Sequence, residues 1–330
     1  MMISFQKIWR TAITAIAVLT FCTGCSSIDA LVKSPWVPID LETDATVQDL
    51  SFIDRDHGWL VGTQSTIMET QDGGQTWDLK SLQIDDQDYR FNSVSFNGDE
   101  GWIVGEPALM LHTEDGGQHW SKITLSAKLP GNPAKIVATG AQTAEMVTDV
   151  GAIYSTKDTG QNWSALVQEA FGALRNVNRS NDGKYVAVSS RGSFYSVWYP
   201  GEVSWEPHNR NSSRRVQGMG FAPDGQLWML NRGGSIQFSK NVSEEEWTDP
   251  FNPDVASGIG LLDLAYRNQD EIWVTGGSGR LLQSTDGGEN WKLDPSVADI
   301  PSNLYRVLFF DQDLGFITGQ DGTLLKYSAA

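Results

Sequence analysis

Short apolar runs bounded by small or polar residues recur along this chain at nearly constant spacing. They are rich in β-branched and aromatic residues, which is typical of a strand buried between sheets. Four of them are Gly58–Gly62 (GWLVG), Gly101–Gly105 (GWIVG), Glu271–Gly276 (EIWVTG) and Leu314–Gly319 (LGFITG). No amphipathic helical periodicity is evident after residue 30. The pattern therefore predicts an all-β fold built from short strands.

A tryptophan marks the same point in each repeat, with spacings of 41, 43, 43, 42, 42 and 44 residues. The seven are Trp36, Trp77, Trp120, Trp163, Trp205, Trp247 and Trp291. A period in the low forties with four short strands per unit is the signature of β-propeller blades. In the unit that ends near residue 82 we expect strands at Val47–Ile53, Gly58–Thr63, Thr66–Thr70 and Trp77–Leu82. Residues 34–330 are predicted to form a seven-bladed β-propeller with four-stranded antiparallel blades.

The two ends of the chain complement each other. The last repeat supplies Asn303–Phe310, Gly315–Gly319 and Leu324–Tyr327 but stops before any tryptophan, whereas Trp36 has no strands before it. We expect the N-terminal strand to join these three and close the ring, because closure covers sheet edges that would otherwise be open to aggregation.

Four repeats carry Ser or Thr, Asp, Gly and Trp at fixed offsets, as in Thr70–Trp77 (TQDGGQTW). This is the Asp-box, in which the Asp accepts backbone N–H groups, Gly adopts a positive φ and Trp packs the turn onto the blade. Its structural residues are Asp72, Trp77, Asp115, Trp120, Asp158, Trp163, Asp286 and Trp291. The fourth and fifth units, at Ser196–Trp205 and Ser239–Trp247, lack the motif.

Sialidases share the Asp-box, so a glycosidase has to be considered. Sialidase chemistry takes place on the opposite face of a propeller and needs an arginine clamp, an early Phe-Arg-Ile-Pro-like segment and a Tyr nucleophile with a Glu partner. The early segment is absent, and Tyr89-Arg90 and Tyr305-Arg306 are its nearest counterparts. The sequence therefore favours a protein without catalytic residues.

Metal and cofactor chemistry have little support in the sequence. The four histidines are His57, His112, His119 and His208, and none is paired at metal-ligand spacing. We expect His57 and His119 to be exposed, because one lies in a turn and the other at a variable Asp-box position. The glycine pairs belong to turns and do not follow a phosphate-loop pattern. No cofactor and no metal site are predicted.

The first residues of the chain resemble a bacterial lipoprotein signal. Lys7 and Arg10 precede an apolar stretch, Thr11–Phe21, that is shorter than the about 20 residues needed to span a bilayer. The following Cys22-Thr-Gly-Cys25-Ser resembles a lipobox with Cys25 as the lipidated residue, although an aliphatic residue is usual where Cys22 stands. We expect a signal peptide at residues 1–24 and a lipidated linker at 25–33. Cleavage without lipidation and an uncleaved anchor are the alternatives.

Charge is distributed unevenly along the chain. The formal net charge is −17, which disfavours nucleic acid as a partner. Between residues 170 and 235, eight basic and four acidic side chains give +4, so the rest carries −21. In a propeller the loops that hold these arginines emerge on one face, near the central channel. The predicted partner-binding residues, placed on blades three to five, are Arg175, Arg191, Arg210, Arg214, Arg215 and Arg232.

The mature chain resembles the photosystem II stability and assembly factors of cyanobacteria and chloroplasts. The resemblance rests on the seven repeats, on the Gly-Trp-x-Val-Gly strands followed by Asp-boxes in Gly58–Trp77 and Gly101–Trp120, on the arginine-rich fourth and fifth blades and on the lipobox. It covers roughly residues 30 to 330. The family's arginine patch corresponds to Arg175, Arg191, Arg210, Arg214 and Arg215, and Arg179, Arg90 and Arg306 are given less weight.

The resemblance implies a monomeric assembly chaperone on the lumenal side of a cyanobacterial thylakoid membrane. Such a protein binds newly made D1 precursor and early reaction-centre intermediates and leaves before the complex matures. Two other classes of protein stay open. One is an exported propeller that binds a different envelope protein or a glycan, and the other is a sialidase-like hydrolase.

Overall fold

The computed structural model describes residues 34–82, 84, 87–210, 212–240, 246–253, 260–297 and 299–328. Cys25 and the expected signal peptide and linker at residues 1–33 lie outside this part of the chain. Residues 35–330 form one compact unit. Within the described residues, no helix has the length and apolar character needed to cross a membrane.

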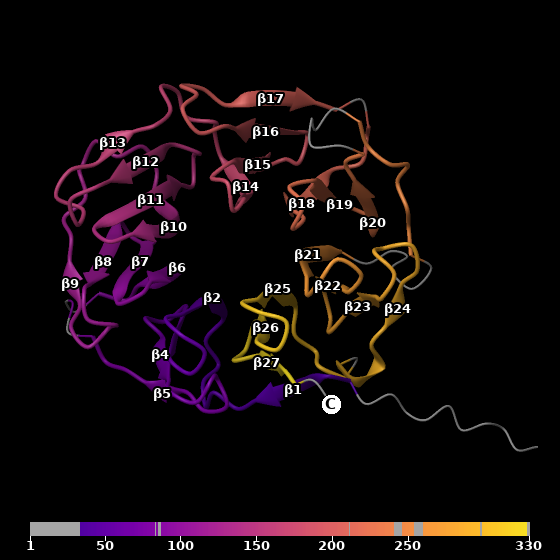
Figure 1. The fold of residues 1–330 in the computed structure, drawn as a ribbon, viewed down its shortest axis with the longest axis horizontal. Helices are drawn as coiled ribbons and strands as arrows, with labels where there is room; N and C mark the ends of the chain where they lie inside the picture. Colours follow the sequence, from indigo (N-terminus) through magenta and orange to yellow (C-terminus); the bar gives the residue numbers. More distant parts are fainter. Residues whose placement is uncertain are drawn as a thin grey trace, which may run out of the picture. The chain divides into compact units, whose positions relative to one another are not determined.

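Seven antiparallel sheets follow one another around a ring, with one strand of each nearest the centre (Figure 1). The innermost strands are β2 (Val47–Phe52), β6 (Arg90–Asn97), β10 (Pro133–Gly140), β14 (Leu174–Arg179), β18 (Val216–Phe221), β21 (Leu261–Tyr266) and β25 (Leu304–Phe309). The second strands are β3 (Gly58–Gly62), β7 (Glu100–Glu106), β11 (Thr143–Thr148), β15 (Tyr185–Ser189), β19 (Leu227–Asn231), β22 (Ile272–Gly276) and β26 (Gly315–Gly319). The seven-bladed β-propeller is confirmed.

The outer strands complete the blades, which we number one to seven from β2 onward. The third strands are β4 (Ile67–Thr70), β8 (Leu109–Thr113), β12 (Ile153–Thr156), β16 (Phe194–Trp198), β20 (Ser235–Phe238), β23 (Leu281–Ser284) and β27 (Leu324–Tyr327). The outermost strands are β5 (Asp78–Leu79), β9 (Ser121–Lys122), β13 (Ser164–Ala165), β17 (Glu206–Asn209), β24 (Lys292–Leu293) and β1 (Trp36–Ile39). A single 3-10 turn at Pro295–Val297 is the only helical element among the described residues.

Two strand expectations need correction. The outermost strand expected at Trp77–Leu82 pairs only over Asp78–Leu79, both exposed at the rim, so little packing extends it. In the described residues blade five is a three-stranded sheet, and two isolated bridges, Ile236 to Phe251 and Ser239 to Trp247, replace its outer strand. This blade also lacks an Asp-box, but so does blade four, whose outermost strand β17 pairs over Glu206–Asn209, so loss of the motif alone does not explain the difference.

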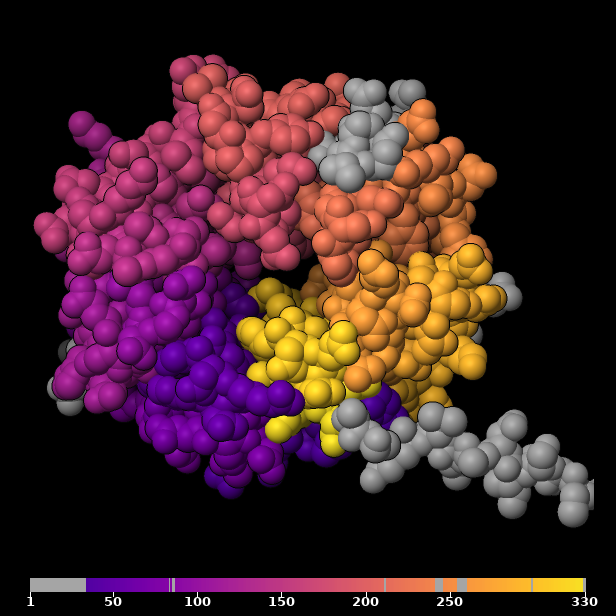
Figure 2. Space-filling model, in the orientation of Figure 1, coloured from indigo at the N-terminus to yellow at the C-terminus, as the bar shows by residue number. Residues whose placement is uncertain are grey.

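The ring is closed by the pairing expected from the chain ends. β1 runs antiparallel to β27, with Trp36 opposite Tyr327 and Ile39 opposite Leu324. In Figure 1 the indigo β1 lies beside the yellow β27, and in Figure 2 indigo and yellow atoms meet at the same place. One blade is thus built from both ends of the propeller, so neither end can leave without opening a sheet.

Seven clusters of buried side chains fill the spaces between neighbouring blades. One packs Trp59 and Val61 of blade one against Phe91 and Ile103 of blade two, and the others repeat this arrangement around the ring. The second strands supply much of this core, because every residue of β3, β15, β19, β22 and β26 is buried. The apolar runs of the sequence therefore occupy the interfaces that hold the blades together.

The Asp-box turns have the expected internal bonds. Asp72 Oδ1 accepts the N–H groups of Gln75 and Thr76, both at 2.9 Å, and the Thr70 hydroxyl accepts the N–H of Gly74 at 2.8 Å. Gly73 and Gly74 adopt φ of 71° and 81°, which disfavours a side chain there. The equivalent bonds to Asp115, Asp158 and Asp286 are present as well.

The box tryptophans pack between blades. Trp120 lies edge-on to Trp59 of blade one at 5.8 Å between ring centroids, and Trp163 lies edge-on to Trp102 of blade two at 6.0 Å. Because each ring contacts the preceding blade, the motif fixes the turn and also helps to set the distance between neighbours.

The Asp-boxes should make the stability of the ring depend on pH. Burial disfavours the charged Asp72 carboxylate, but hydrogen bonds from Thr76 and Thr70 outweigh it and lower its pKa to about 2. The ordinary value is 3.8, so the folded state favours the charged form. The stabilisation is therefore complete well above that value and is lost as the pH falls toward the folded pKa. We expect Asp72→Asn to lower the Tm most near neutral pH.

Thermal melting of the native chain and Asp72→Asn between about pH 6 and pH 3 measures this effect. The difference in Tm should be nearly constant well above the ordinary value of 3.8 and should shrink as the pH falls toward and below it. A difference that stays constant over the range would mean that the charge of Asp72 contributes nothing.

Candidate functional site

The six predicted arginines lie at the same end of two neighbouring blades, and we call them the arginine face. In blade four, Arg175 is near the start of β14 and Arg191 is in the turn between β15 and β16. In the connection to blade five and in blade five itself are Arg210, Arg214, Arg215 and Arg232. In an antiparallel blade this end is opposite the Asp-box turns, which join the third and fourth strands. The six arginines therefore lie on blades four and five, and none of them belongs to blade three.

Hydrogen bonds connect the two blades within this face. Arg175 donates through Nη2 to the carbonyl oxygen of Ser190 at 2.8 Å and through Nη1 to Gln217 Oε1 at 3.0 Å. The N–H of Val216 donates to the carbonyl oxygen of Gly192 at 2.9 Å. The turn that holds Arg191 is thereby held against the start of β18, so residues 42 apart in the sequence become neighbours.

The remaining arginines are joined through blade five. The N–H of Arg232 donates to the carbonyl oxygen of Arg215 at 2.7 Å, and Arg210 Nη1 donates to the carbonyl oxygen of Arg214 at 2.7 Å. Arg214 Nη1 also donates to Asn252 Oδ1 at 2.9 Å. These contacts place all of the predicted residues in one continuous area.

The arginine face carries positive charge that no ion pair neutralises among the described residues. Five of the six side chains belong to exposed residues, and Arg210 is half-buried. Burial lowers the pKa of Arg210, but a guanidinium still stays protonated at physiological pH. In the part of the chain that the structure describes, none of the six forms an ion pair, whereas Arg179, Arg267 and Arg306 each do. Planar guanidinium groups in this state suit bidentate bonds to carboxylates.

Sequence reasoning missed two residues of this surface. Asn252 bonds both to Arg214 and, through Nδ2, to the carbonyl oxygen of Gly233 at 3.1 Å. The neighbouring Phe251 is 45% exposed although it is a large apolar side chain. Aromatic and arginine side chains together are typical of the energetic centre of a protein interface. Neither residue is charged or occupies a recurring place in the repeat, so no pattern in the sequence singled them out.

The arginines given less weight have structural partners. Arg179 is the last residue of β14, where Nε contacts Glu145 Oε2 at 2.8 Å. Arg306 pairs with Asp49 of blade one, and Arg90 Nη2 donates to Gln48 Oε1 at 3.1 Å. The ion pairs hold Arg179 and Arg306 within the ring. Arg90 is instead exposed and donates to an uncharged amide, as Arg175 does.

The centre of the ring is polar. A cavity of about 210 Å³ is lined by the innermost strands, and Figure 2 shows a hollow at this position. Asp49 accepts a bond from Ser93 Oγ at 2.7 Å besides its pair with Arg306, which links blades seven, one and two. Burial raises the pKa of Asp263 to about 6, although Arg306 opposes the shift. Charged side chains thus tie the inner strands together across blades.

A tyrosine and a glutamate do lie together in this fold. Tyr185 donates its hydroxyl to Glu145 Oε2 at 3.0 Å, beside Arg179. Tyr185 has no exposed surface, and burial raises the pKa of its phenol well above the ordinary value. A buried phenol that resists ionisation is unavailable to attack a sugar, so the pair is part of the core.

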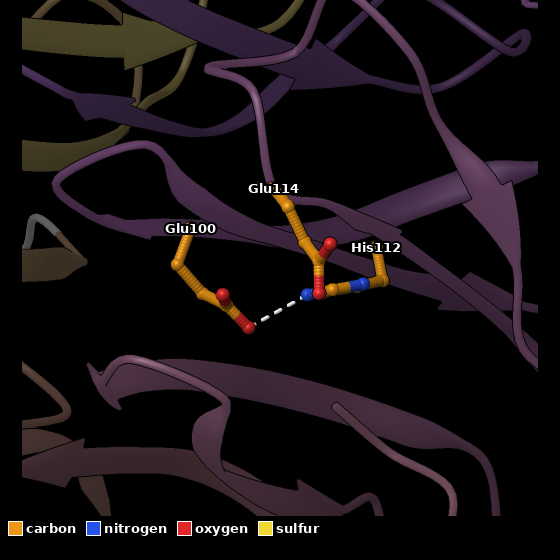
Figure 3. Close-up of side chains that lie close together, drawn as sticks. All are labelled: Glu100, His112 and Glu114. Atoms are coloured by element: carbon orange, nitrogen blue, oxygen red, sulfur yellow. Dashed lines mark hydrogen bonds and ion pairs between the residues drawn. The ribbon is translucent and has the colours of Figure 1, made fainter. Parts of the chain in front are cut away.

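Two of the histidines, His112 and His57, lie in environments that the sequence did not predict. His112 Nε2 lies 2.6 Å from Glu100 Oε1, and both side chains are nearly buried. Glu114 completes a group whose ligand atoms all lie within 4.8 Å of one another (Figure 3). His57, expected to be exposed, is bonded to Glu69 at 2.8 Å with its side chain only 25% exposed, whereas His119 is 87% exposed as expected. The absence of metal-ligand spacing in the sequence therefore did not exclude this group.

Fold and site together define a seven-bladed Asp-box propeller with a basic face at one end of two adjacent blades. A model of the family described as "Photosynthesis system II assembly factor YCF48" matches residues 28–328. The chain belongs to this family of photosystem II assembly factors, which is non-catalytic.

Individual relatives cover almost the whole chain. The photosystem II assembly lipoprotein Ycf48 of Synechocystis is 61% identical over 99% of this chain and 95% of its own length. The Ycf48 assembly protein of Thermosynechococcus vestitus is 58% identical over 95% and 90%. A solved structure described as YCF48 bound to D1 peptide is 59% identical, with a TM-score of 0.89 over 91% of this chain and 97% of that one.

Proposed function

We propose that this chain is an assembly factor that binds newly made D1 and early photosystem II reaction-centre intermediates through its arginine face. The observation that carries the proposal is the gathering of six arginines, unpaired with acids among the described residues, on two adjacent blades. The solved relative described as bound to D1 peptide supports the choice of partner. We infer that acidic side chains of the partner pair with these guanidinium groups.

The chemistry of this face suits a transient partner. Exposed ion pairs contribute little each, about 0–1 kcal/mol, and complementary charge mainly speeds and orients association. An assembly factor has to release its client before the complex matures. A face of exposed arginines, with the exposed Phe251 next in sequence to the Asn252 that bonds Arg214, permits both rapid docking and release.

We further propose that Cys25 carries a lipid and holds the propeller on the lumenal side of the thylakoid membrane. The lipobox-like Cys22–Ser26 supports this, and the Synechocystis relative is described as a lipoprotein. An anchored factor would meet membrane-inserted D1 at a high local concentration, so a moderate affinity would be enough.

Affinity capture from solubilised thylakoid membranes tests the proposed partner. The tagged full chain should recover D1 and other early reaction-centre subunits, and recovery should fall as the ionic strength rises, because salt screens exposed charges. Recovery of envelope proteins or glycans without reaction-centre subunits would overturn the proposal.

A further inference from the structure

The group Glu100, His112 and Glu114 lies at the Asp-box end of blade two, away from the arginine face. Glu100 opens β7, His112 is the penultimate residue of β8, and Glu114 follows β8 in the box turn. Figure 3 shows the three side chains converging, with Glu100 bonded to His112. Trp102 packs against the imidazole at 4.2 Å between ring centroids and fixes its orientation.

The same position is occupied differently in other blades. In blade one, His57 contacts Glu69 twelve residues later, and in blade six Gln283 Nε2 donates to Glu271 at 3.3 Å over the same separation. A polar pair joining the second and third strands is therefore a repeated structural feature. The repeat explains why His112 faces Glu100, but it does not explain Glu114.

In blade one, a lysine neutralises the carboxylate of the corresponding pair. Glu69 is neutralised by Lys80 Nζ at 2.7 Å and accepts a bond from Gln71 Nε2 at 3.1 Å. Forty-three residues later, the position of Lys80 is held by Ile123 and that of Gln71 by Glu114. Blade two has thus lost the cation and gained a second carboxylate.

The result is a group with excess negative charge, in which Glu100 and His112 are nearly buried and Glu114 is exposed. Within the described residues, neither Glu100 nor Glu114 pairs with Lys or Arg, and His112 alone cannot neutralise both. Buried carboxylates are costly unless they are paired or bind a metal. A divalent cation would supply the charge that Lys80 supplies in blade one.

We propose that Glu100, His112 and Glu114 bind a divalent cation of the Zn²⁺ type. One imidazole nitrogen, His112 Nε2, and one oxygen from each glutamate would be the protein ligands, and water would take the fourth position. Tetrahedral zinc with bonds near 2.0–2.1 Å places its ligand atoms about 3.3 Å apart. The present separations of up to 4.8 Å close by rotation of the exposed Glu114 side chain.

Bonds to the ion would replace the contact between His112 Nε2 and Glu100, because the imidazole has to present that nitrogen without a proton. The ion would then fasten the box turn to β7 and β8. We infer a structural role for it, because the site lies at the opposite end of the blade from the arginine face.

Zn²⁺ titration of the metal-free full chain by calorimetry tests the proposal. The protein should carry no polyhistidine tag, and any free thiol of Cys22 or Cys25 should be alkylated to remove thiolate ligands. We expect about one ion per chain at this site and a rise in Tm with added Zn²⁺. Glu114→Gln and His112→Gln should each weaken binding at least about ten-fold, since loss of even a ligand's neighbour has that effect.

The fold already accommodates glutamine at both positions, because Gln71 of blade one corresponds to Glu114 and Gln283 of blade six corresponds to His112. Both variants should therefore have the Tm of the native metal-free chain. His57→Gln in blade one is the matched control and should leave Zn²⁺ binding unchanged. Binding that survives Glu114→Gln and His112→Gln, or no binding by the native chain, would overturn the proposal.

Discussion

Reversing the charge of Arg214 and Arg215 should reduce recovery of D1 from solubilised thylakoid membranes by at least about ten-fold, equivalent to about 1.4 kcal/mol. The two residues lie at the centre of the arginine face, where Arg210 and Asn252 both contact Arg214. Glutamate at these positions removes attraction to partner carboxylates and adds repulsion, and opposed like charges are costly at an interface. Affinity capture by Arg214→Glu/Arg215→Glu, beside the native chain, measures the loss.

A charge-matched control separates position from net charge. Arg55, whose side chain is 64% exposed, and Lys157, exposed in the blade-three box, both lie at the Asp-box end. Arg55→Glu/Lys157→Glu changes the net charge equally and should retain near-native recovery. Equal losses in the two double variants would show that overall charge controls binding. No loss in either would remove the arginine face from the interface.

Replacing Trp36 by alanine should destabilise the ring by about 3–5 kcal/mol, the usual cost of emptying a buried tryptophan site. Trp36 is 4% exposed and lies edge-on to Trp273 of blade six at 5.4 Å and to Tyr327 of β27 at 5.2 Å. The side chain therefore joins the closing strand, the last strand and the preceding blade. In a chain of this size the loss corresponds to a fall in Tm of roughly 6–10 °C.

The neighbouring Val37 provides the control, because it lies on the same strand but is 42% exposed. Val37→Ala should change the free energy of unfolding by no more than about 0.5 kcal/mol. Thermal and urea unfolding of the two variants decide the matter. If Trp36→Ala and Val37→Ala both change the free energy of unfolding by the same small amount, β1 does not stabilise the closed ring through Trp36.

The fold could be predicted almost entirely from the sequence because each blade repeats the same local code. The tryptophan period set the blade number, and the runs such as Gly58–Gly62 marked the second strands within a residue. The outermost strands of the blades were harder to predict. The outer strand after Trp77 is short because its residues are exposed, and blade five has two isolated bridges in place of an outer strand although blade four, which also lacks the box, keeps one.

The order of strands in a propeller predicts at which end of a blade each residue of the candidate site lies, but not which side chains it contacts. Loop position placed six arginines at one end, but whether a guanidinium finds a carboxylate depends on contacts between distant segments. Arg306 meets Asp49 from 257 residues away, which no local pattern reveals. The His112 and Glu100 pair was hidden for a related reason, since its residues face each other only once strand register is known.

Site-specific photo-crosslinking tests the central claim most directly, because it reports which end of the propeller contacts D1. A photoreactive residue at Ser213, exposed beside Arg214, leaves every arginine in place, and one at Gln161, exposed in the blade-three box, probes the opposite end. The account predicts D1 adducts from position 213 and none from position 161. Adducts from position 161 alone would contradict it.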